Sequence, residues 1–388
     1  MIETLATPRL LGVLPDGFRV YSISGSERGI TTEGDALVTH LNDGTALNDV
    51  WGEFQSVLNI WNTQRTAITN LLSHRTDRVV DAVAQTTSRD EFEIASELGA
   101  PQSMRVSPDI LTLGNHFEWY DAASRFSWKA LAEMNRDQIE ATHALALESD
   151  NRNTTRAIMR QLLTPVLGEN DRGHTVYPLF NGEGAAPPAR NGREFNAGHT
   201  HYVSSNGPLT GSDVEWAYDT IREHGYVTPS SRLLILANPG DARDVSRFRA
   251  NTVAPDMSVT SYDFIPGQGA PAYLTDQEIV GARAPEAFER LPIVGSYGPG
   301  WLIESEFIPE GYVIVVATGG SNSDVNPVSF REHRRPELRG LRLLPGSQSG
   351  YPLTGGYYSR GFGTGVRHRG AAAVIQVSPD ATYTPPAL

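Results

Sequence analysis

Residues 115–164 read NHFEWYDAASRFSWKALAEMNRDQIEATHALALESDNRNTTRAIMRQLLT and contain neither glycine nor proline. The whole chain has 37 Gly and 25 Pro among 388 residues, so one of the two is expected about every six positions. Glycine in a helix costs backbone entropy, and proline removes a hydrogen-bond donor and clashes with the preceding turn. The stretch therefore predicts a long helix, with a bend at Asn135, where Asn135 and Gln138 can form a capping box.

An apolar stripe along the same stretch supports this helix. Its members recur every three or four residues, as on one helical face: Tyr120, Ala123, Phe126, Ala130, Leu131 and Met134. At about 1.5 Å per residue, thirty residues of helix would span about 45 Å. That length exceeds what a compact enzyme domain usually needs, so we expect a structural spine.

The composition excludes several classes of protein. The chain has no cysteine, which excludes disulfides, thiolate nucleophiles and every zinc site that uses cysteine. A net charge of −13 disfavours direct reading of nucleic acid, although an acidic wall can enclose DNA without adhering to it. No apolar run approaches eighteen residues and the first residues lack a signal-peptide pattern, so we expect a soluble protein with no membrane partner.

The segments before the central stretch lack a compact core of their own. Residues 1–44 carry many turn signals and predict an extended arm. Residues 47–72 have an apolar stripe that includes Trp51 and Trp61, which predicts a helix that needs a partner surface in the same or a neighbouring subunit. Residues 93–117 predict a long hairpin-like excursion, whose two arms would be residues 104–106 and 110–113.

The segments after it predict a compact α/β or α+β domain over residues 208–320. A capping box of Ser212 and Glu215 would start a helix that Gly225 closes. Short apolar runs predict strands at 195–203, 233–237, 291–297, 301–308 and 312–318. A last apolar strand at 370–377 must pair with something already formed, so we expect the chain to return to an earlier domain.

His199 and His201 are the strongest candidates for metal ligands, because alternate residues of a strand face the same side. A cupin-type site would need a glycine six positions before the first histidine and a glutamate shortly after the second. Arg193, Ser205 and Asn206 occupy those places, so the pattern fails. Two polar residues on a strand face is the better interpretation, and we expect no metal site.

Other catalytic patterns fail as well. The pair His116 and Glu118 resembles part of a deaminase motif, but that chemistry also needs cysteines. A phosphate-binding loop that ends in Gly-Lys is impossible, because the only lysine, Lys129, follows Trp128. Residues 361–365 lack the spacing of a dinucleotide-binding loop. We therefore expect no catalytic residue and no cofactor.

The charged run Arg331-Glu-His-Arg334-Arg335 has two open interpretations. It is either a solvated surface, or a charged ledge between subunits where the planar arginine groups meet carboxylates.

The order of these segments resembles the Hong Kong 97-type major capsid proteins of tailed double-stranded DNA bacteriophages. The resemblance lies in residues 117–134, 209–245 and 327–377, and covers the chain from about Glu93 to the C-terminus. It implies an α+β fold with four parts. An N-terminal arm at 1–92 includes the helix 47–72, and an extended E-loop hairpin follows at 93–117. A peripheral domain with the spine helix comprises 118–207 and 326–388, and an axial domain with a central sheet comprises 208–325.

The resemblance implies a major capsid protein that self-assembles through hexamers and pentamers into an icosahedral head enclosing double-stranded DNA. The location would be the virion capsid, with assembly in the host cytoplasm. The implied partners are other copies of the chain, with portal and scaffolding proteins and a possible decoration protein. Some relatives cross-link their shells through a lysine on the hairpin; this hairpin has none, so we expect a non-covalent shell with no cross-linking residue.

We expect the contacts between subunits to involve apolar and arginine side chains on the first helix, the hairpin and the charged run. The candidates are Trp51, Trp61, Met104, Arg105, Leu111, Leu113, Arg331, Arg334 and Arg335. Three alternatives remain at this point: an encapsulin-like nanocompartment shell, a tail or accessory structural protein, and a metal-dependent enzyme that uses His199 and His201.

Overall fold

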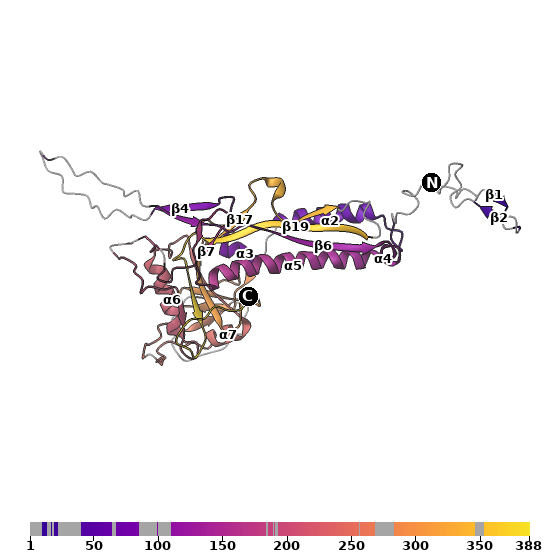
Figure 1. The fold of residues 1–388 in the computed structure, drawn as a ribbon. Coiled ribbons are helices and arrows are strands. Elements are labelled where there is room, and N and C mark those ends of the chain that lie inside the picture. Colours follow the sequence, from indigo (N-terminus) through magenta and orange to yellow (C-terminus); the bar gives the residue numbers. More distant parts are fainter. Residues whose placement is uncertain are drawn as a thin grey trace. The chain divides into compact units, whose positions relative to one another are not determined.

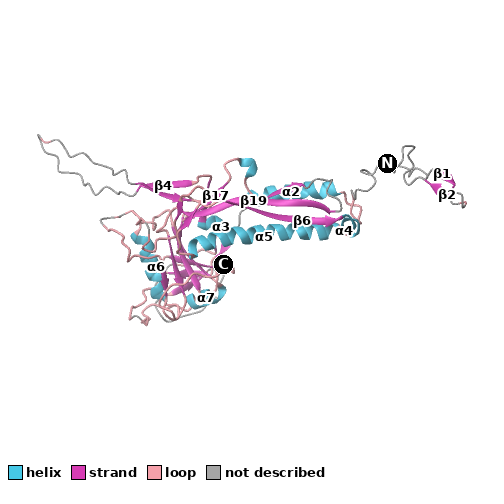
Figure 2. Ribbon diagram, viewed as in Figure 1, coloured by secondary structure: helices cyan, strands magenta, loops and turns pink. Residues whose placement is uncertain are grey.

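The computed structural model describes residues 10–13, 17, 19–21, 40–63, 67–84, 99, 110–183, 185–188, 190, 193–255, 257–267, 283–345 and 353–388. The chain divides into two compact units. The first comprises Met1–Ile60, Ala122–Ala146 and Leu343–Tyr358, and the second comprises Trp61–Asp121, Leu147–Arg342 and Ser359–Leu388. Figure 1 labels the elements along the chain, and Figure 2 distinguishes helices, strands and loops.

A seven-stranded sheet forms the centre of the second unit. Its strands run in the order β11 (Phe264–Pro266), β14 (Gly295–Tyr297), β15 (Gly300–Glu304), β10 (Arg232–Ala237), β16 (Tyr312–Thr318), β20 (Ala372–Gln376) and β9 (Tyr202–Ser204). β10 pairs with β15 in parallel and with β16 antiparallel. The apolar runs predicted as buried strands at 233–237 and 312–318 are thus confirmed as the middle of the sheet.

Both faces of this sheet are buried, and alternate residues of one strand supply the two cores. Leu234 and Leu236 of β10 join a core that also contains residues of α3 (Ala67–Leu72) and the end of α5 (Arg136–Leu163). Leu233 and Ile235 join the opposite core, with residues of α6 (Gly211–Glu223) and α7 (Pro239–Val245). A strand that must be apolar on both sides has no polar alternation, which explains the continuous apolar runs.

The strand predicted at residues 370–377 is confirmed as β20, and it pairs with strands formed earlier in the chain. β20 pairs antiparallel with β16 and parallel with β9, inside the seven-stranded sheet. Ala372, Ala373, Val374 and Ile375 are all fully buried. A strand with no polar face is stable only between two covered faces, and the interior of the sheet provides that position.

Helix α6, which covers one face of the sheet, begins at a defined cap. The N-cap of α6 is Thr210, with Asp213 closing the capping box, two residues before the predicted pair. Glu215 instead accepts hydrogen bonds from the Ser261 backbone N–H at 2.8 Å and the Tyr297 hydroxyl at 2.7 Å. Gly225 follows the helix with a φ of +83°, as its predicted role at the end of the helix requires.

The stretch 115–164 is only partly helical. It forms β6 (Glu118–Ser127), the short helix α4 (Trp128–Glu133) and the 28-residue helix α5. The prediction of one helix from residue 115 was therefore wrong for its first part. Strands exclude glycine and proline as helices do, and aromatic residues such as Trp119 and Tyr120 favour strands, so the missing breakers did not discriminate between the two.

The predicted bend at Asn135 is confirmed as the start of α5. The Gln138 backbone N–H donates to Asn135 Oδ1, and the Asn135 backbone N–H donates to Gln138 Oε1, both at 3.1 Å. This reciprocal pair satisfies two donors that a helix N-terminus leaves free. Ser127 caps α4 by accepting from the Ala130 backbone N–H at 3.1 Å.

A second sheet contains β18 (Arg342–Pro345), β19 (Leu353–Val366), β17 (Val328–Glu332) and β3 (Ser73–Thr76) in that order, and β6 pairs with β19.

Three alternate glycines of β19 leave room for the residues just before β6, and at its start, to approach the β19 backbone closely. A Cβ at Gly363 would lie 1.9 Å from the His116 carbonyl oxygen, and one at Gly365 would lie 2.3 Å from Asn115 Oδ1. These glycines, considered above only as a failed nucleotide loop, serve close packing of strands.

The predicted arm at 110–113 is confirmed as a strand, and its partner lies earlier in the chain than residues 93–117. Ile110–Gly114 forms β5, and its partner is β4 (Val80–Ala84), with Val80 opposite Gly114 and Ala84 opposite Ile110. The predicted arm at 104–106 lies outside the described residues. Residues 80–84 alternate polar and apolar side chains only weakly, so their pairing with residues 110–114 could not be predicted from this pattern.

The first unit has its own small core. Apolar residues of α2 (Leu47–Thr63), the segment before it, the end of β6, α4 and the start of α5 form it: Leu41, Leu47, Val50, Phe54, Phe126, Leu131 and Ile139. The Phe54 ring stacks on His143 at 4.0 Å, and His143 Nδ1 lies 2.8 Å from the Tyr358 hydroxyl oxygen. The helix predicted at 47–72 corresponds to α2 and α3, with residues 64–66 between them outside the described residues.

Short elements complete the structure. They are the paired strands β1 (Leu10–Val13) and β2 (Arg19–Tyr21), β7 (Gly168–Glu169) and β8 (Thr175–Val176), β12 (Ala287–Phe288) and β13 (Leu291–Pro292), and the 3-10 helix η1 (Pro336–Leu338). None of the helices in the described part of the chain combines the length and the apolar character that crossing a membrane requires.

Candidate functional site: a buried polar network and the predicted contact residues

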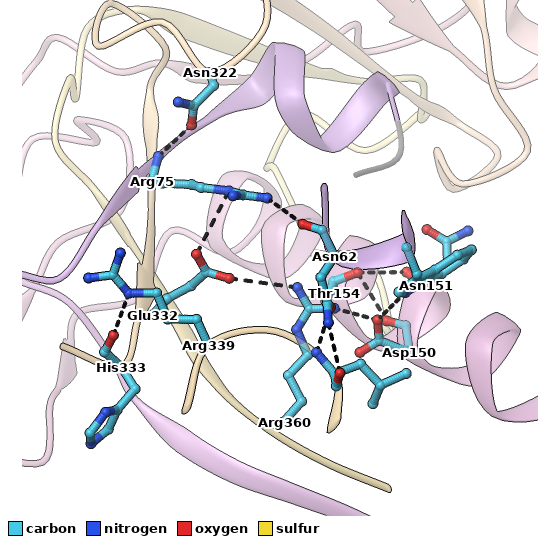
Figure 3. A network of polar contacts seen from close by, with 12 residues as sticks. Asn62, Arg75, Asp150, Asn151, Thr154, Asn322, Glu332, His333, Arg339 and Arg360 are labelled. Carbon is cyan, nitrogen blue, oxygen red and sulfur yellow. Dashed lines mark hydrogen bonds and ion pairs between the residues drawn. The ribbon is translucent and has the colours of Figure 1, made fainter. Parts of the chain in front are cut away.

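A buried ion pair joins α5 to β19 inside the second unit. Asp150 Oδ2 pairs with Arg360 Nη1, and the two side chains are 5% and 8% exposed. The Trp61 indole N–H donates to the same Asp150 oxygen at 2.9 Å. Figure 3 shows this aspartate and arginine at the centre of a wider network of polar contacts.

Glu332 of β17 extends the network. Its two carboxylate oxygens lie 4.0 Å from Arg360 Nη2 and 3.7 Å from Arg75 Nε, so it bridges an arginine of β19 and one of β3 (Figure 3). The Arg360 guanidinium also lies 5.7 Å from the ring centres of Phe330 and Phe362. Charged groups this deeply buried are stable only when paired, so the network fixes how these elements pack.

Asn62 anchors the segment after η1 to the end of α2. Its side-chain amide donates to the Leu341 carbonyl oxygen at 2.8 Å and accepts from the Leu341 backbone N–H at 2.7 Å. Gly340 has a φ of +76° and lies against this amide, where a Cβ would meet Asn62 Oδ1 at 2.4 Å. Glycine is therefore required at this turn on two grounds, backbone angle and space.

Arg331 is neither a solvated residue nor an exposed ledge. Its Nη1 donates to Asp171 Oδ1 at 2.6 Å and to the Asn115 carbonyl oxygen at 2.9 Å, and its side chain is 9% exposed. Burial alone would raise the pKa of Asp171, but the hydrogen bond and charge of Arg331 outweigh it, and the pKa is lowered. Arg334 and Arg335, by contrast, are exposed just before η1.

The other predicted contact residues divide between covered and exposed positions. Trp51 is half-buried and packs edge-on against Phe54 at 5.5 Å, while Trp61 bonds to Asp150 as described. Leu113 is 2% exposed within its own chain, and Leu111 is half-buried. Met104 and Arg105 lie outside the described residues. Both tryptophans thus have partners in the same chain, which their spacing in the sequence did not reveal.

A cavity of about 300 Å³ lies beside the C-terminal part of α5, between β6, β19 and the segment 164–168. Its lining includes Glu118, Tyr120, Arg160, Val166 and Leu167. The Tyr120 hydroxyl donates to Glu118 Oε2 at 3.1 Å, which uses the one carboxylate in the lining. The cavity thus contains one acid, already bonded to a hydroxyl, among polar and apolar side chains of α5 and β19.

The prediction that His199 and His201 share one face of a strand was wrong. Both precede β9, which begins only at Tyr202, and the backbone there follows a turn. They nevertheless converge with a third histidine, His224, the C-cap of α6. His224 Nε2 lies 2.9 Å from His199 Nε2 and 3.0 Å from His201 Nε2. His224 could not be grouped with them from the sequence, because it lies 23 positions after His201 and only the fold brings the rings together.

Comparison with solved structures supports the assignment of the fold. No protein-family model and no curated protein sequence matches the chain. A solved structure from Mycobacterium phage Patience matches with a TM-score of 0.71 and 34% identity, covering 93% of this chain and 96% of that chain. A weaker match is the capsid of an empty GTA particle, with a TM-score of 0.45 and 13% identity, covering 81% of this chain and 91% of that chain. Another is the holo-SrpI encapsulin complex from Synechococcus elongatus, with a TM-score of 0.42 and 14% identity, covering 81% of this chain and 89% of that chain.

The long helix, the paired long strands and the helix-covered central sheet define a Hong Kong 97-type capsid fold. At 34% identity over nearly its whole length, the chain belongs to the major capsid proteins of tailed bacteriophages that have this fold. It is a structural protein that forms the shell of a phage head by self-assembly. The encapsulin alternative is not favoured, because the solved structure that shares 34% identity with the chain comes from a phage.

Proposed function

We propose that the subunits assemble through hexamers and pentamers into an icosahedral head that encloses double-stranded DNA. The observation that carries this proposal is the extent of the match to the Patience phage structure, which covers 93% of this chain and 96% of that chain. The match therefore extends over nearly the full length of both chains. A net charge of −13 suits a container wall, because repulsion prevents the DNA from adhering to it.

In this proposal, each predicted part of the fold has a place in the shell. Residues 93–117 form the E-loop, continuing the hairpin whose base is β4 and β5. Residues 118–207 and 326–388 form the peripheral domain, residues 208–325 the axial domain, and residues 1–92 the arm. Two strands of the peripheral segments, β9 and β20, complete the central sheet of the axial domain. The large interfaces that such assemblies need are typically thousands of Å² and make subunit stability depend on assembly.

The shell is held together without covalent links. The only lysine, Lys129, lies on α4, where its ammonium is 5.8 Å from the Trp128 ring centre. No lysine is present on the hairpin, so the isopeptide bond of some relatives has no donor there. Purified particles boiled in denaturant should run as a single subunit band. A ladder of linked subunits on the gel would disprove this part of the proposal.

We assign contacts between subunits to the predicted residues whose side chains the chain itself leaves accessible. Among the described residues these are Arg334 and Arg335 before η1 and Leu111 on β5. Met104 and Arg105, which lie outside the described residues, stay candidates on the strength of the sequence alone. Trp51, Trp61, Leu113 and Arg331 already have partners within the chain and would contribute less. Exposed arginines suit such contacts, because the planar guanidinium binds carboxylates in a bidentate manner.

The proposal includes further partners of the phage head. A portal protein, a scaffolding protein and possibly a decoration protein would join the shell, and assembly would take place in the host cytoplasm. Electron microscopy of particles purified from producing cells tests the proposal as a whole. Heads that contain nuclease-protected double-stranded DNA support it, whereas small cages around a cargo enzyme, or tubes, would contradict it.

A further inference from the structure

Three imidazole nitrogens converge at one point of the second unit. His199, His201 and His224 form the only group of three or more metal-ligating side chains of this kind among the described residues, and their nitrogens all lie within 4.8 Å of one another. We propose that these three histidines bind one divalent transition-metal ion of the zinc type, with water as the fourth ligand. The site would be structural and is independent of the proposed role in DNA packaging.

The backbone holds the three rings in place before any ion binds. The His201 backbone N–H donates to the Phe180 carbonyl oxygen at 2.7 Å, and its carbonyl oxygen accepts from the Val374 N–H of β20 at 2.8 Å. His224 ends α6, and its ring stacks on Phe195 at 3.8 Å. Gly370 leaves room for that ring, since a Cβ there would lie 2.5 Å from His224 Cγ. A preformed site loses little entropy on binding.

The tautomer of His201 is the one that metal binding requires. His201 is fully buried, and its Nδ1 lies 2.7 Å from the Ala372 carbonyl oxygen. A carbonyl can only accept, so Nδ1 carries the proton. Burial is the main cause that lowers the pKa of His201 well below its usual value, and the nearby His224 is the second cause. The ring is therefore neutral, and Nε2 presents a lone pair. A backbone carbonyl on the outer nitrogen is the usual second contact of a metal-bound histidine.

Protons alone do not satisfy this cluster. His224 Nε2 contacts both other nitrogens, at 2.9 and 3.0 Å, but it carries at most one proton and so can donate well to only one of them. If His224 Nε2 is unprotonated, its lone pair faces that of His201. A cation is attracted to all three lone pairs at once. In a tetrahedral zinc site the ligand nitrogens are about 3.3 Å apart, within a few tenths of an ångström of these two contacts.

The surroundings favour a structural role for the ion. Burial is also the main cause that lowers the pKa of His199, so its ring is available as a neutral ligand. The nearest acid, Glu223, pairs with Arg193 at 2.7 Å, and His199 and His224 are half-exposed, which leaves water as the fourth ligand. The ion would join the loop before β9 to the end of α6. A chain without cysteine has no disulfide to make such a link.

The test uses full-length protein without a polyhistidine tag, stripped with a chelator and then dialysed against Zn²⁺ or Co²⁺. We expect one ion per subunit by elemental analysis, and Co²⁺ should give the visible absorption typical of tetrahedral coordination. His199→Ala and His224→Ala should each lower binding at least tenfold, while His174→Ala, at an exposed histidine elsewhere, should leave it unchanged.

A thermal scan separates loss of binding from loss of folding. Chelation should lower the melting temperature of the wild type and leave that of folded His199→Ala unchanged. The proposal is overturned if wild type binds less than a stoichiometric amount of both ions, or if His199→Ala and His224→Ala bind them as tightly as wild type does.

Discussion

Replacing Asp150 by alanine tests whether the buried network stabilises the fold. Among the described residues, the change would leave the Arg360 guanidinium, 8% exposed, with Glu332 at 4.0 Å as its remaining charged partner. It would also remove the acceptor of the Trp61 N–H. Removing one partner of a buried ion pair typically costs about 3–5 kcal/mol. We therefore expect Asp150→Ala to lower the free energy of unfolding by about that amount.

Guanidinium unfolding of unassembled subunits, at one fixed protein concentration, measures this loss without the contribution of assembly. Glu148→Ala is the matched control on the same helix, because it breaks the exposed pair of Glu148 with Arg152, at 3.1 Å, and should cost less than about 1 kcal/mol. Adding Arg360→Met to Asp150→Ala should recover part of the loss, since it removes the uncompensated charge. The reasoning is refuted if Asp150→Ala costs no more than Glu148→Ala.

Three further predictions concern other parts of the fold. Gly363→Ala should destabilise the protein by at least about 2 kcal/mol, because its Cβ would lie 1.9 Å from a backbone oxygen. Gly52→Ala is the control: its Cβ would have no atom within 4 Å, so the change should be neutral or stabilising. Equal unfolding midpoints of the two variants would contradict this prediction. Asn135→Ala should cost about 1 kcal/mol through loss of the cap, and an unchanged midpoint would show that the cap contributes nothing. Burial lowers the pKa of His368 to about 4, so the unfolded chain binds more protons than the folded chain between pH 6.5 and 4. The stabilising effect is complete above that window, and within it the free energy of unfolding falls by up to about 1.4 kcal/mol per pH unit. His368→Gln should reduce this pH dependence in unfolding curves measured across the window.

The sequence predicted those elements whose local pattern has only one physical explanation. The apolar runs of β10 and β16 had to be buried strands, and the pairing of Asn135 with Gln138 had to be a helix start. The order of such segments was enough to suggest the capsid fold. Local chemistry did not decide between helix and strand at residues 118–127, because both exclude glycine and proline.

The errors arose where residues far apart in the chain determine the structure. The two edges of β20 pair with β16 and β9, and no property of residues 372–376 alone reveals these partners. The three glycines of β19 are explained only by the strand that approaches them. His224 joined His199 and His201 in the same way, through the fold and not through spacing.

Electron cryomicroscopy of the purified, self-assembled protein tests the central claim most directly. The account predicts closed icosahedral shells in which subunits surround five-fold and six-fold positions, and in which each subunit shows the seven-stranded sheet and the 28-residue helix α5. Only monomers, or open tubes with no closed shell under any assembly condition, would contradict it.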